Sequence, residues 1–237
     1  MNIIILHGQS AHEGSTYEIT KQIVDLVAGA DSSVRELSFP SDFKGTHCRG
    51  CKICFFAGEK ECPDAVYVQP IVEAMLAADL IVLASPTYCY GISGAMKTFL
   101  DRLGYCWMEH RPYPSMFSKI GLCISTSGYV PGSKRTVEQL IDNMHGWGIS
   151  NIVGYPKAVF SGSWDRIQPK IMEQIMAEIP QIAEQVKALI GKDGVDEVVK
   201  NSFLEMRTVQ QGNMWNKLDR DHWEQAGWLA DSRPWKE

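Results

Sequence analysis

The sequence predicts an α/β protein with a doubly wound parallel sheet, in which helices cover both faces of five strands. Two observations predict this fold. Short β-rich runs alternate with amphipathic helical stretches five times along the chain, and this alternation requires right-handed crossovers within one sheet. Two of the runs, residues 2–6 (unbroken apolar from Ile3 onward) and residues 80–84, are nearly or fully apolar, as expected of strands that are buried on both faces.

Composition and charge place the chain among ordinary globular proteins. It has 237 residues, of which 45% are hydrophobic and 22% charged. The net charge of -5 argues against binding to nucleic acid or anionic lipid, since both require a basic surface. No apolar run reaches the ~18 residues that span a bilayer, and the N-terminus lacks the basic segment of a signal peptide. We therefore expect a cytoplasmic protein without membrane contact, whose thiols stay reduced.

The first half of the chain supplies three strands and the helices between them. After the strand at residues 2–6, the capping-box pattern Ser15-Thr16-Tyr17-Glu18 predicts the start of a helix that ends at Gly29. Residues 33–39 form a weaker second strand, which Pro40 stops. A helix is expected over residues 70–78, with Pro70 tolerated in its first turn. The strand at residues 80–84 precedes a helix at residues 93–103.

The second half of the chain completes the sheet. Residues 120–125 and 151–160 are the fourth and fifth strands, and apolar side chains at helical spacing between them predict an amphipathic helix. A long helix follows over residues 167–190, which Pro169 and Pro180 can break or kink. These elements form the first expected domain of the chain, an α/β domain over residues 1–190.

The tail after Gly191 is polar, but it holds four tryptophans, Trp215, Trp223, Trp228 and Trp235. That is too much apolar area for a disordered segment. We expect residues 191–237 to form an ordered helical extension that packs on the domain or on a partner subunit.

Three loops carry the residues of a candidate ligand site. In a parallel sheet, the loops that leave the carboxyl ends of the strands share one edge, where ligands bind. The first loop, residues 8–16, places small and hydroxyl-bearing residues at a helix N-terminus, which suits a phosphate group; these residues are Ser10, Gly14, Ser15 and Thr16. It lacks the P-loop lysine and the dinucleotide glycine spacing, so among phosphate ligands a mononucleotide is favoured. The alternative is a plain capped loop.

The second and third loops offer surfaces for a planar ring. In the second, Pro86 stiffens the turn, Tyr88 and Tyr90 supply flat faces, and Gly91 permits close backbone approach. The alternative is that both tyrosines only cover the core. The third loop, residues 125–132, again combines small polar residues with a glycine and an aromatic residue; those of interest are Ser127, Gly128 and Tyr129.

A further loop concentrates four of the seven cysteines. Cys48, Cys51, Cys54 and Cys62 have the spacing C-x2-C-x2-C-x7-C, which allows the thiolates to wrap one [4Fe-4S] cluster. Zinc fits less well, because its sites usually join two separated cysteine pairs. The alternative is a cysteine-rich loop without a cluster. Of the other cysteines, Cys106 and Cys123 are expected to be buried, and Cys89 stands apart because it lies in the ring loop.

The segment that follows residue 103 is aromatic and partly basic, with Tyr105, Trp107, His110 and Arg111. It could cover the ring or contact the phosphates of a nicotinamide nucleotide. We favour the other interpretation, a subunit contact or an exposed loop, because loop composition alone does not make a site.

Two stretches also carry a family resemblance. Ser85-Pro86-Thr87-Tyr88 and "SGAMKTFLDRL" at residues 93–103 match, together with the cysteine loop and Ser127-Gly128-Tyr129, the pattern of a known family. On these residues the chain resembles the flavodoxin-fold NAD(P)H-dependent FMN reductases, and within them the branch of the iron-sulfur flavoproteins. The likeness covers roughly residues 1–160 and implies the flavodoxin-like strand order 2-1-3-4-5.

The resemblance implies FMN as cofactor and NAD(P)H as substrate. The phosphate would then lie on Ser10, Gly14, Ser15 and Thr16. The flavin ring would lie against Pro86, Thr87, Tyr88, Cys89, Tyr90 and Gly91, and Ser127, Gly128 and Tyr129 would close its other side. One departure concerns the phosphate loop, which begins Gly8-Gln9-Ser10-Ala11 where many relatives have an arginine; His12 could lend a weaker charge.

The implied function is that of an oxidoreductase, which passes hydride from a nicotinamide nucleotide to flavin and then to a small acceptor such as a flavin or quinone. No side chain stands out as a catalytic acid or base. One alternative is an iron-sulfur flavoprotein that carries electrons with FMN, a [4Fe-4S] cluster and a ferredoxin-type partner. Another is a thiol or zinc sensing module without enzymatic activity. We expect a homodimer or homotetramer, because relatives often complete the flavin site across a subunit contact.

Overall fold

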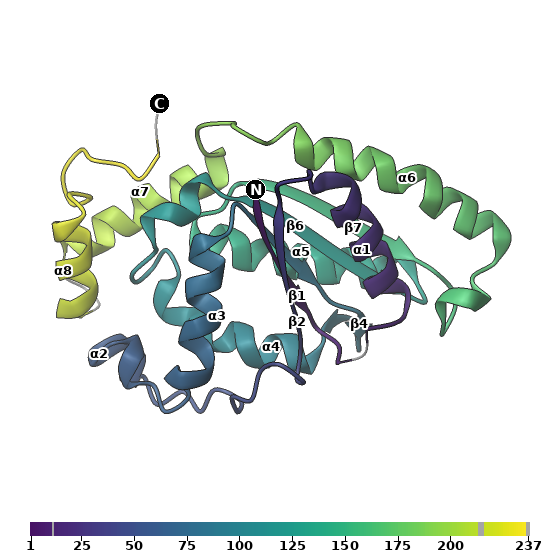
Figure 1. The fold of residues 1–237 in the computed structure, drawn as a ribbon. Coiled ribbons are helices and arrows are strands. Elements are labelled where there is room, and N and C mark those ends of the chain that lie inside the picture. Colours follow the sequence, from purple (N-terminus) through teal and green to yellow (C-terminus); the bar gives the residue numbers. More distant parts are fainter. Residues whose placement is uncertain (11, 213–215, 236–237) are drawn as a thin grey trace.

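The structure, a computed structural model that describes residues 1–10, 12–212 and 216–235, is built on a five-stranded parallel sheet (Figure 1). Its strands are β1 (Asn2–His7), β2 (Ser33–Ser38), β3 (Leu80–Ala84), β6 (Ile120–Ser127) and β7 (Asn151–Ala158). They lie in the order β2-β1-β3-β6-β7 and every neighbouring pair is parallel. This confirms the predicted doubly wound sheet, since β6 and β7 are the fourth and fifth strands of the expected order 2-1-3-4-5.

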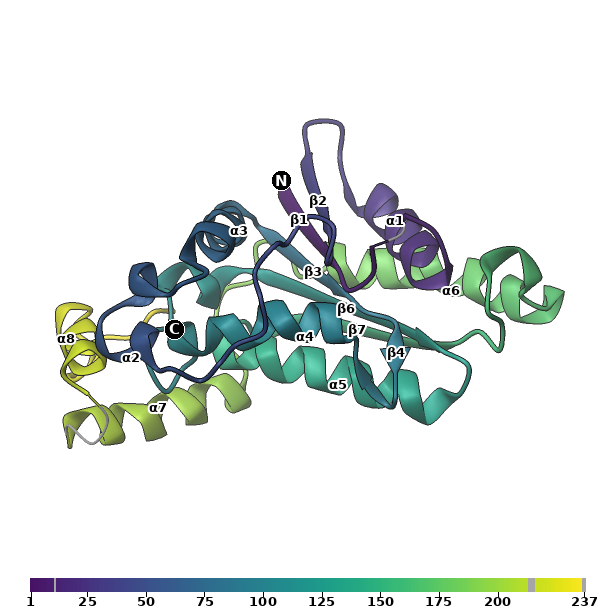
Figure 2. The same cartoon turned by 90° about the horizontal axis from the view of Figure 1, so that it is seen from below.

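Helices cover both faces of this sheet (Figure 2). On one face lie α1 (Ser15–Val27) and α6 (Pro169–Lys187), and on the other lie α3 (Ala65–Ala77), α4 (Gly94–Leu100) and α5 (Val130–Trp147). Short elements complete the domain: α2 (Ile53–Phe56), η1 (Glu59–Glu61), η2 (Asp101–Cys106), η3 (Pro114–Ser118), η4 (Trp164–Arg166) and the hairpin strands β4 (Thr87–Tyr88) and β5 (Gly91–Ile92).

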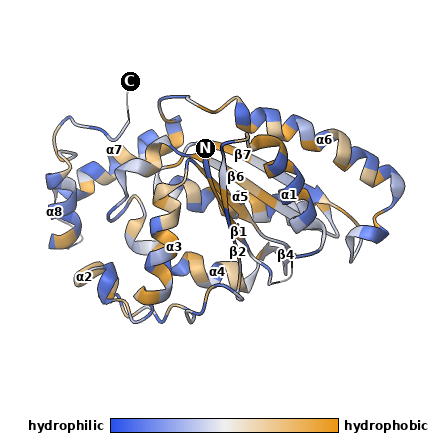
Figure 3. Ribbon diagram, in the orientation of Figure 1, coloured by the Kyte–Doolittle hydropathy of each residue, from blue (hydrophilic) through white to orange (hydrophobic). Residues whose placement is uncertain are grey.

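The first strand shows why the sheet needs two covering layers. Ile3 and Ile5 pack with α1 and α6, whereas Ile4 and Leu6 point to the opposite layer, and all four are at most 3% exposed. Alternate side chains of a strand project to opposite faces, so an unbroken apolar run must be buried twice. The central strands are mostly orange in Figure 3, whereas α6 alternates between blue and orange along its length.

Several element boundaries differ from the prediction. The helix α3 begins at Ala65 rather than at residue 70, so that Pro70 lies inside it. The expected helix over residues 93–103 ends at Leu100 and continues as a 3₁₀ helix. The capping box was wrong: the N-cap of α1 is Gly14, which makes no side-chain cap. Pro169 stands in the first turn of α6, where its missing N–H is tolerated, and the helix continues through Pro180.

The last part of the chain folds into α7 (Glu197–Gln211) and α8 (Lys217–Gln225). Their apolar side chains form a separate cluster with residues 108 and 117 of the main body, and Trp223 and Trp228 are at most 2% exposed. Trp215 lies outside the described residues. Tyr105 is buried in the main core, and Arg111 is buried where it pairs with Asp219 of α8, so our expectation of an exposed loop after residue 103 was wrong.

None of the helices in the described parts of the chain is both long and apolar enough to cross a bilayer.

The aromatic cluster under α7 should contribute strongly to stability. Phe203 is fully buried, and its ring stacks on Trp223 with centroids 4.9 Å apart. We expect Phe203→Ala to lower the free energy of unfolding by about 3–5 kcal/mol, because the cavity cannot collapse fully. The matched control is Leu204→Ala on the next position of α7, which is 37% exposed and should cost less than about 1 kcal/mol. Urea unfolding measures both; equal losses would show that the cluster is not tightly packed.

Candidate functional site

A cavity of about 690 Å³ opens at the carboxyl edge of the sheet, a size in the range of cofactor sites. It collects most of the residues that the sequence nominated. The predicted residues that line it are Ser10, Gly14, Ser15, Thr16, Pro86, Thr87, Tyr88, Ser127 and Gly128. The lining residues do not include Cys89, Tyr90, Gly91 or Tyr129. The loops that follow the first, third and fourth strands thus line one cavity.

Sequence reasoning missed the loop that follows the last strand. Val159 and the run Ser161, Gly162, Ser163, Trp164 and Asp165 line the same cavity, as do Phe39 and Pro40 after β2. The signal was present in the sequence, because Ser161-Gly162-Ser163 repeats the small polar composition of the other loops. The prediction covered only the loops after the first, third and fourth strands.

The phosphate-loop candidate closes around the start of α1. Gly14 has a φ of 91°, a left-handed conformation that favours glycine. Ser15 and Thr16 are buried, and the Thr16 hydroxyl lies 2.7 Å from that of Thr126, which ties the first loop to the end of β6. The first turn of a helix leaves backbone N–H groups without helical partners, so this end of the cavity can receive an anion.

The charges around the cavity are acidic. Among the described lining residues there is no lysine or arginine, whereas Glu13, Glu18 and Asp165 are present. His12 does not line the cavity; its Nδ1 lies 3.5 Å from Glu36. An anion at this site would therefore be held by backbone N–H groups, hydroxyls and the dipole of α1.

The ring-loop candidate is a tight β-hairpin that the sequence did not predict. β4 and β5 are antiparallel, and the two residues between them, Cys89 and Tyr90, have φ values of 50° and 61°. This is the geometry of a primed hairpin turn, in which Asn and Gly are the usual residues. Non-glycine residues in this conformation are uncommon, and such strain concentrates at functional sites.

Hydroxyl and amide contacts anchor this hairpin to its neighbours. The Thr87 hydroxyl lies 3.0 Å from the hydroxyls of both Ser125 and Thr136. Gln139 of α5 accepts a hydrogen bond of 3.2 Å from the N–H of Ile92. The hairpin is thus fastened to β6 and α5, although Tyr88 and Tyr90 themselves are more than half exposed.

Comparison with known proteins decides the family. The family model described as NADPH-dependent FMN reductase matches residues 1–181. The chain belongs to the NADPH-dependent FMN reductase family. It is therefore an oxidoreductase, and the family supports FMN and NAD(P)H as cofactor and substrate.

Individual relatives agree with the family. The chain is 28% identical to an iron-sulfur flavoprotein of Methanocaldococcus jannaschii over 60% of this chain and 70% of that protein. It is 24% identical to an iron-sulfur flavoprotein of Archaeoglobus fulgidus over 80% of this chain and 82% of the relative. Among solved structures, an azoreductase from Bacillus anthracis superposes with a TM-score of 0.61 at 15% identity, covering 79% of this chain and 99% of that one, and this likeness supports the fold.

The four cysteines of the cysteine loop do not line the cavity. Cys48 and Cys51 are exposed, Cys54 and Cys62 are half-buried, and all seven cysteines are free thiols. Burial raises the pKa of Cys54 to about 11, and the thiols of Cys62, Cys48 and Cys51 add to this shift. The other three thiols thus lie within electrostatic range of Cys54. Within the described residues, however, no three His, Cys, Asp or Glu side chains are arranged to hold a metal ion.

A buried arginine holds one side of this loop. Arg102 donates to the carbonyl oxygens of Thr46 and His47, pairs with Asp64, and places an N–H 3.5 Å from the sulfur of Cys62. Hydrogen bonds to sulfur stabilise thiolates and tune the clusters that they bind. As expected, Cys106 and Cys123 are buried, whereas Cys89 is exposed on the hairpin turn.

A buried histidine stands at the end of β1. His7 is 1% exposed, and its Nε2 lies 3.2 Å from Glu36. Burial, followed by the nearby charge of His12, lowers the pKa of His7 to about 4 in spite of that carboxylate. His7 is therefore neutral at neutral pH.

Acidification should destabilise the wild-type protein more than His7→Asn. The unfolded chain protonates His7 below its ordinary pKa of 6.5, whereas the folded chain does so only near 4. The stability linked to His7 is thus complete above pH 6.5 and is lost as the pH falls toward 4. Between pH 7 and 4.5 we expect the wild type to lose about 2 kcal/mol more than the variant. Urea unfolding at both pH values measures this; equal losses would contradict the assignment.

Proposed function

We propose that the protein is an NAD(P)H-dependent, FMN-containing oxidoreductase that passes hydride from a nicotinamide nucleotide to flavin and on to a small acceptor such as a flavin or quinone. The observation that carries this proposal is the single cavity that joins the N-terminus of α1 to the loops after β3, β6 and β7. FMN, when bound, supplies the hydride chemistry, while the protein supplies binding, orientation and exclusion of water.

The residues of the cavity suit the two ends of FMN. Ser10, Gly14, Ser15 and Thr16, with the free N–H groups of α1, are the proposed phosphate site. The hairpin and the loop after β6 are the proposed ring site, formed by Pro86, Thr87, Tyr88, Cys89, Tyr90, Gly91, Ser127, Gly128 and Tyr129. Cys89, Tyr90, Gly91 and Tyr129 do not line the cavity, so their contact would come from the hairpin turn and the loop beside it.

The protein's contribution is positional. The Thr16–Thr126 hydroxyl pair and the contacts of Thr87 with Ser125 hold the phosphate and ring loops at a fixed separation. Rigid placement of the reacting groups is itself a large part of catalysis. We assign no side chain as a catalytic acid or base.

A substitution in the cavity tests the flavin site. No atom lies within 4 Å of a Cβ built on Gly128, so a side chain fits there without disturbing the fold. We expect Gly128→Phe to fill the cavity and to raise the Kd for FMN at least tenfold, about 1.4 kcal/mol. Gly128→Ala is the matched control and should bind FMN like the wild type. Quenching of flavin fluorescence measures both; unchanged FMN affinity in Gly128→Phe would place the flavin elsewhere.

A second candidate function is an iron-sulfur flavoprotein, an electron carrier with FMN, a [4Fe-4S] cluster and a ferredoxin-type partner. Four thiols gathered around Cys54, with the Arg102 N–H directed at Cys62, favour it, and the two curated relatives described above carry that name. The number and type of ligands fit a cluster. The loop would have to draw its sulfur atoms together, because the described residues do not form a ready metal site.

Iron analysis tests the cluster. Protein purified without oxygen should contain about four iron and four sulfide per chain. Cys51→Ser should remove most of the iron, because Cys51 is one of the four proposed ligands. Cys51 is exposed, so its substitution should not disturb the fold. The control Cys106→Ser changes a buried thiol that donates to the carbonyl of Leu103 and should retain iron. Iron-free wild-type protein with full flavin turnover would reject the cluster and leave the reductase proposal intact.

Family membership favours an enzyme over the sensing module. A purified protein without bound flavin and without NAD(P)H oxidation would reverse that preference. We further propose that the protein is cytoplasmic and forms a homodimer or homotetramer. Light scattering would give the number of subunits.

A further inference from the structure

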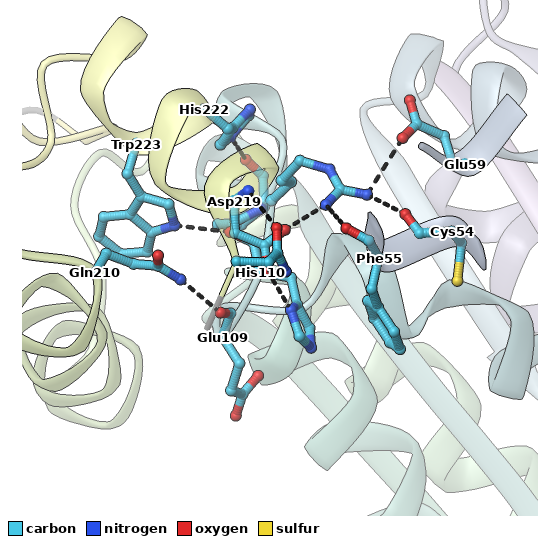
Figure 4. A network of polar contacts seen from close by, with 12 residues as sticks. Cys54, Phe55, Glu59, Glu109, His110, Gln210, Asp219, His222 and Trp223 are labelled. Carbon is cyan, nitrogen blue, oxygen red and sulfur yellow. Dashed lines mark hydrogen bonds and ion pairs between the residues drawn. The ribbon is translucent and has the colours of Figure 1, made fainter. Parts of the chain in front are cut away.

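Cys54 and Phe55 of the cysteine loop lie close to Asp219 of the C-terminal extension (Figure 4), and one buried arginine contacts all three. Arg111 is 8% exposed. On one side its guanidinium donates to the carbonyl oxygen of Cys54 at 2.6 Å and to that of Phe55 at 3.4 Å. On the other side it pairs with the carboxylate of Asp219 on α8. The planar guanidinium carries five N–H donors in a fixed geometry, which allows these contacts at once.

The acidic partner is held firmly by the extension. Asp219 is fully buried, and its carboxylate accepts a hydrogen bond from Asn216 Nδ2 at 2.6 Å. Its backbone N–H donates in turn to Asn216 Oδ1, the oxygen that caps α8. His110 Nδ1 lies 2.6 Å from the same carboxylate, and Trp223 donates to the carbonyl of His110 at 2.7 Å. The position of Arg111 therefore depends on α8.

The loop side of this contact is a short helix. The helix α2 contains four residues, none of them fully buried, and its N-cap is Lys52, whose φ is 62°. A helix this short is unstable without tertiary contacts. Cys54 and Phe55 pack against the core of the domain, Arg111 binds their two carbonyls, and the ring of Phe55 stacks on His110 with centroids 4.2 Å apart. The contacts with Arg111 and His110 lead to Asp219 of the extension, and α2 and α8 lie side by side in Figures 1 and 2.

We propose that Arg111 is a positioning residue through which the C-terminal extension, by way of Asp219, fixes the conformation of the cysteine loop and with it the relative placement of the four thiols. Cys54 is bound through its own carbonyl, so the contact acts directly on one of the cysteines. On this proposal, the tryptophan-rich C-terminal extension helps to set the positions of the four cysteine side chains. The proposal concerns loop geometry and holds with or without a cluster.

Hydrogen exchange of the full-length, FMN-loaded protein tests the proposal. Arg111→Lys keeps a positive charge opposite Asp219 but lacks the second terminal nitrogen, so that it cannot reach Asp219 and both carbonyls with the geometry of the guanidinium. We expect the amides of residues 53–57 to exchange about tenfold faster, while those of α8 keep their protection. Asp219→Asn should accelerate exchange in both segments. Glu59→Gln is the matched control, because Glu59 contacts Arg111 at 3.5 Å from a more exposed position; its exchange should stay near that of the wild type.

Two results would overturn the proposal. One is exchange at residues 53–57 within twofold of the wild type in both variants, and the other is acceleration of β6 in step with the loop, which would show only a global effect. If Asp219→Asn does not fold, Asn216→Ala weakens the hold on Asp219 without leaving a buried charge unpaired, and it should accelerate α8 and the loop together. Iron content, measured on the same samples, separates the questions: accelerated exchange without iron in any sample supports the positioning role and rejects the cluster.

Discussion

Burial of the central strands on both faces is the constraint on which the site depends. Since residues 3–6 of β1 and all of β3 are apolar, neither face of the sheet can meet water, and each connection must cross over as a helix. All strands then run the same way, and their outgoing loops meet at one edge. Ser10, Thr87 and Ser127 come from distant parts of the chain, yet they line one cavity. The topology of the sheet, rather than contacts between the loops, brings these polar loops together.

The cysteine loop is held in a different way, because few of its side chains, Cys54 and Phe55 among them, pack against the core. Two arginines, Arg102 and Arg111, add polar contacts, and both lie in the segment that follows α4. Removing one partner of a buried ion pair typically costs 3–5 kcal/mol, roughly the scale of a large core truncation. The loop is therefore ordered by a few polar contacts together with this limited packing, while most of its side chains remain exposed.

Periodic features of the sequence predicted the fold well, and contacts between distant segments were not predictable. The apolar runs at residues 2–6 and 80–84 settled the sheet, and the small polar residues after three strands located the cavity. Two errors had local causes. Pro70 suggested a helix start because proline is favoured in the first turn, but α3 begins five residues earlier, at Ala65. The capping-box pattern placed the N-cap of α1 at Ser15, whereas the N-cap is Gly14, which has no side chain to make a cap. The pairing of Arg111 with Asp219 spans 108 positions and has no periodicity to reveal it. The hairpin at Cys89 and Tyr90 was missed because neither residue is typical of a left-handed turn.

The absence of lysine and arginine among the described residues of the cavity wall has a consequence for association. A doubly charged phosphate approaching an acidic protein gains no steering from its field and is weakly repelled by Glu13, Glu18 and Asp165. Added electrolyte screens that repulsion, so raised ionic strength should leave capture of the cofactor unchanged or quicken it. Sites that grip phosphate with cationic side chains behave in the opposite way.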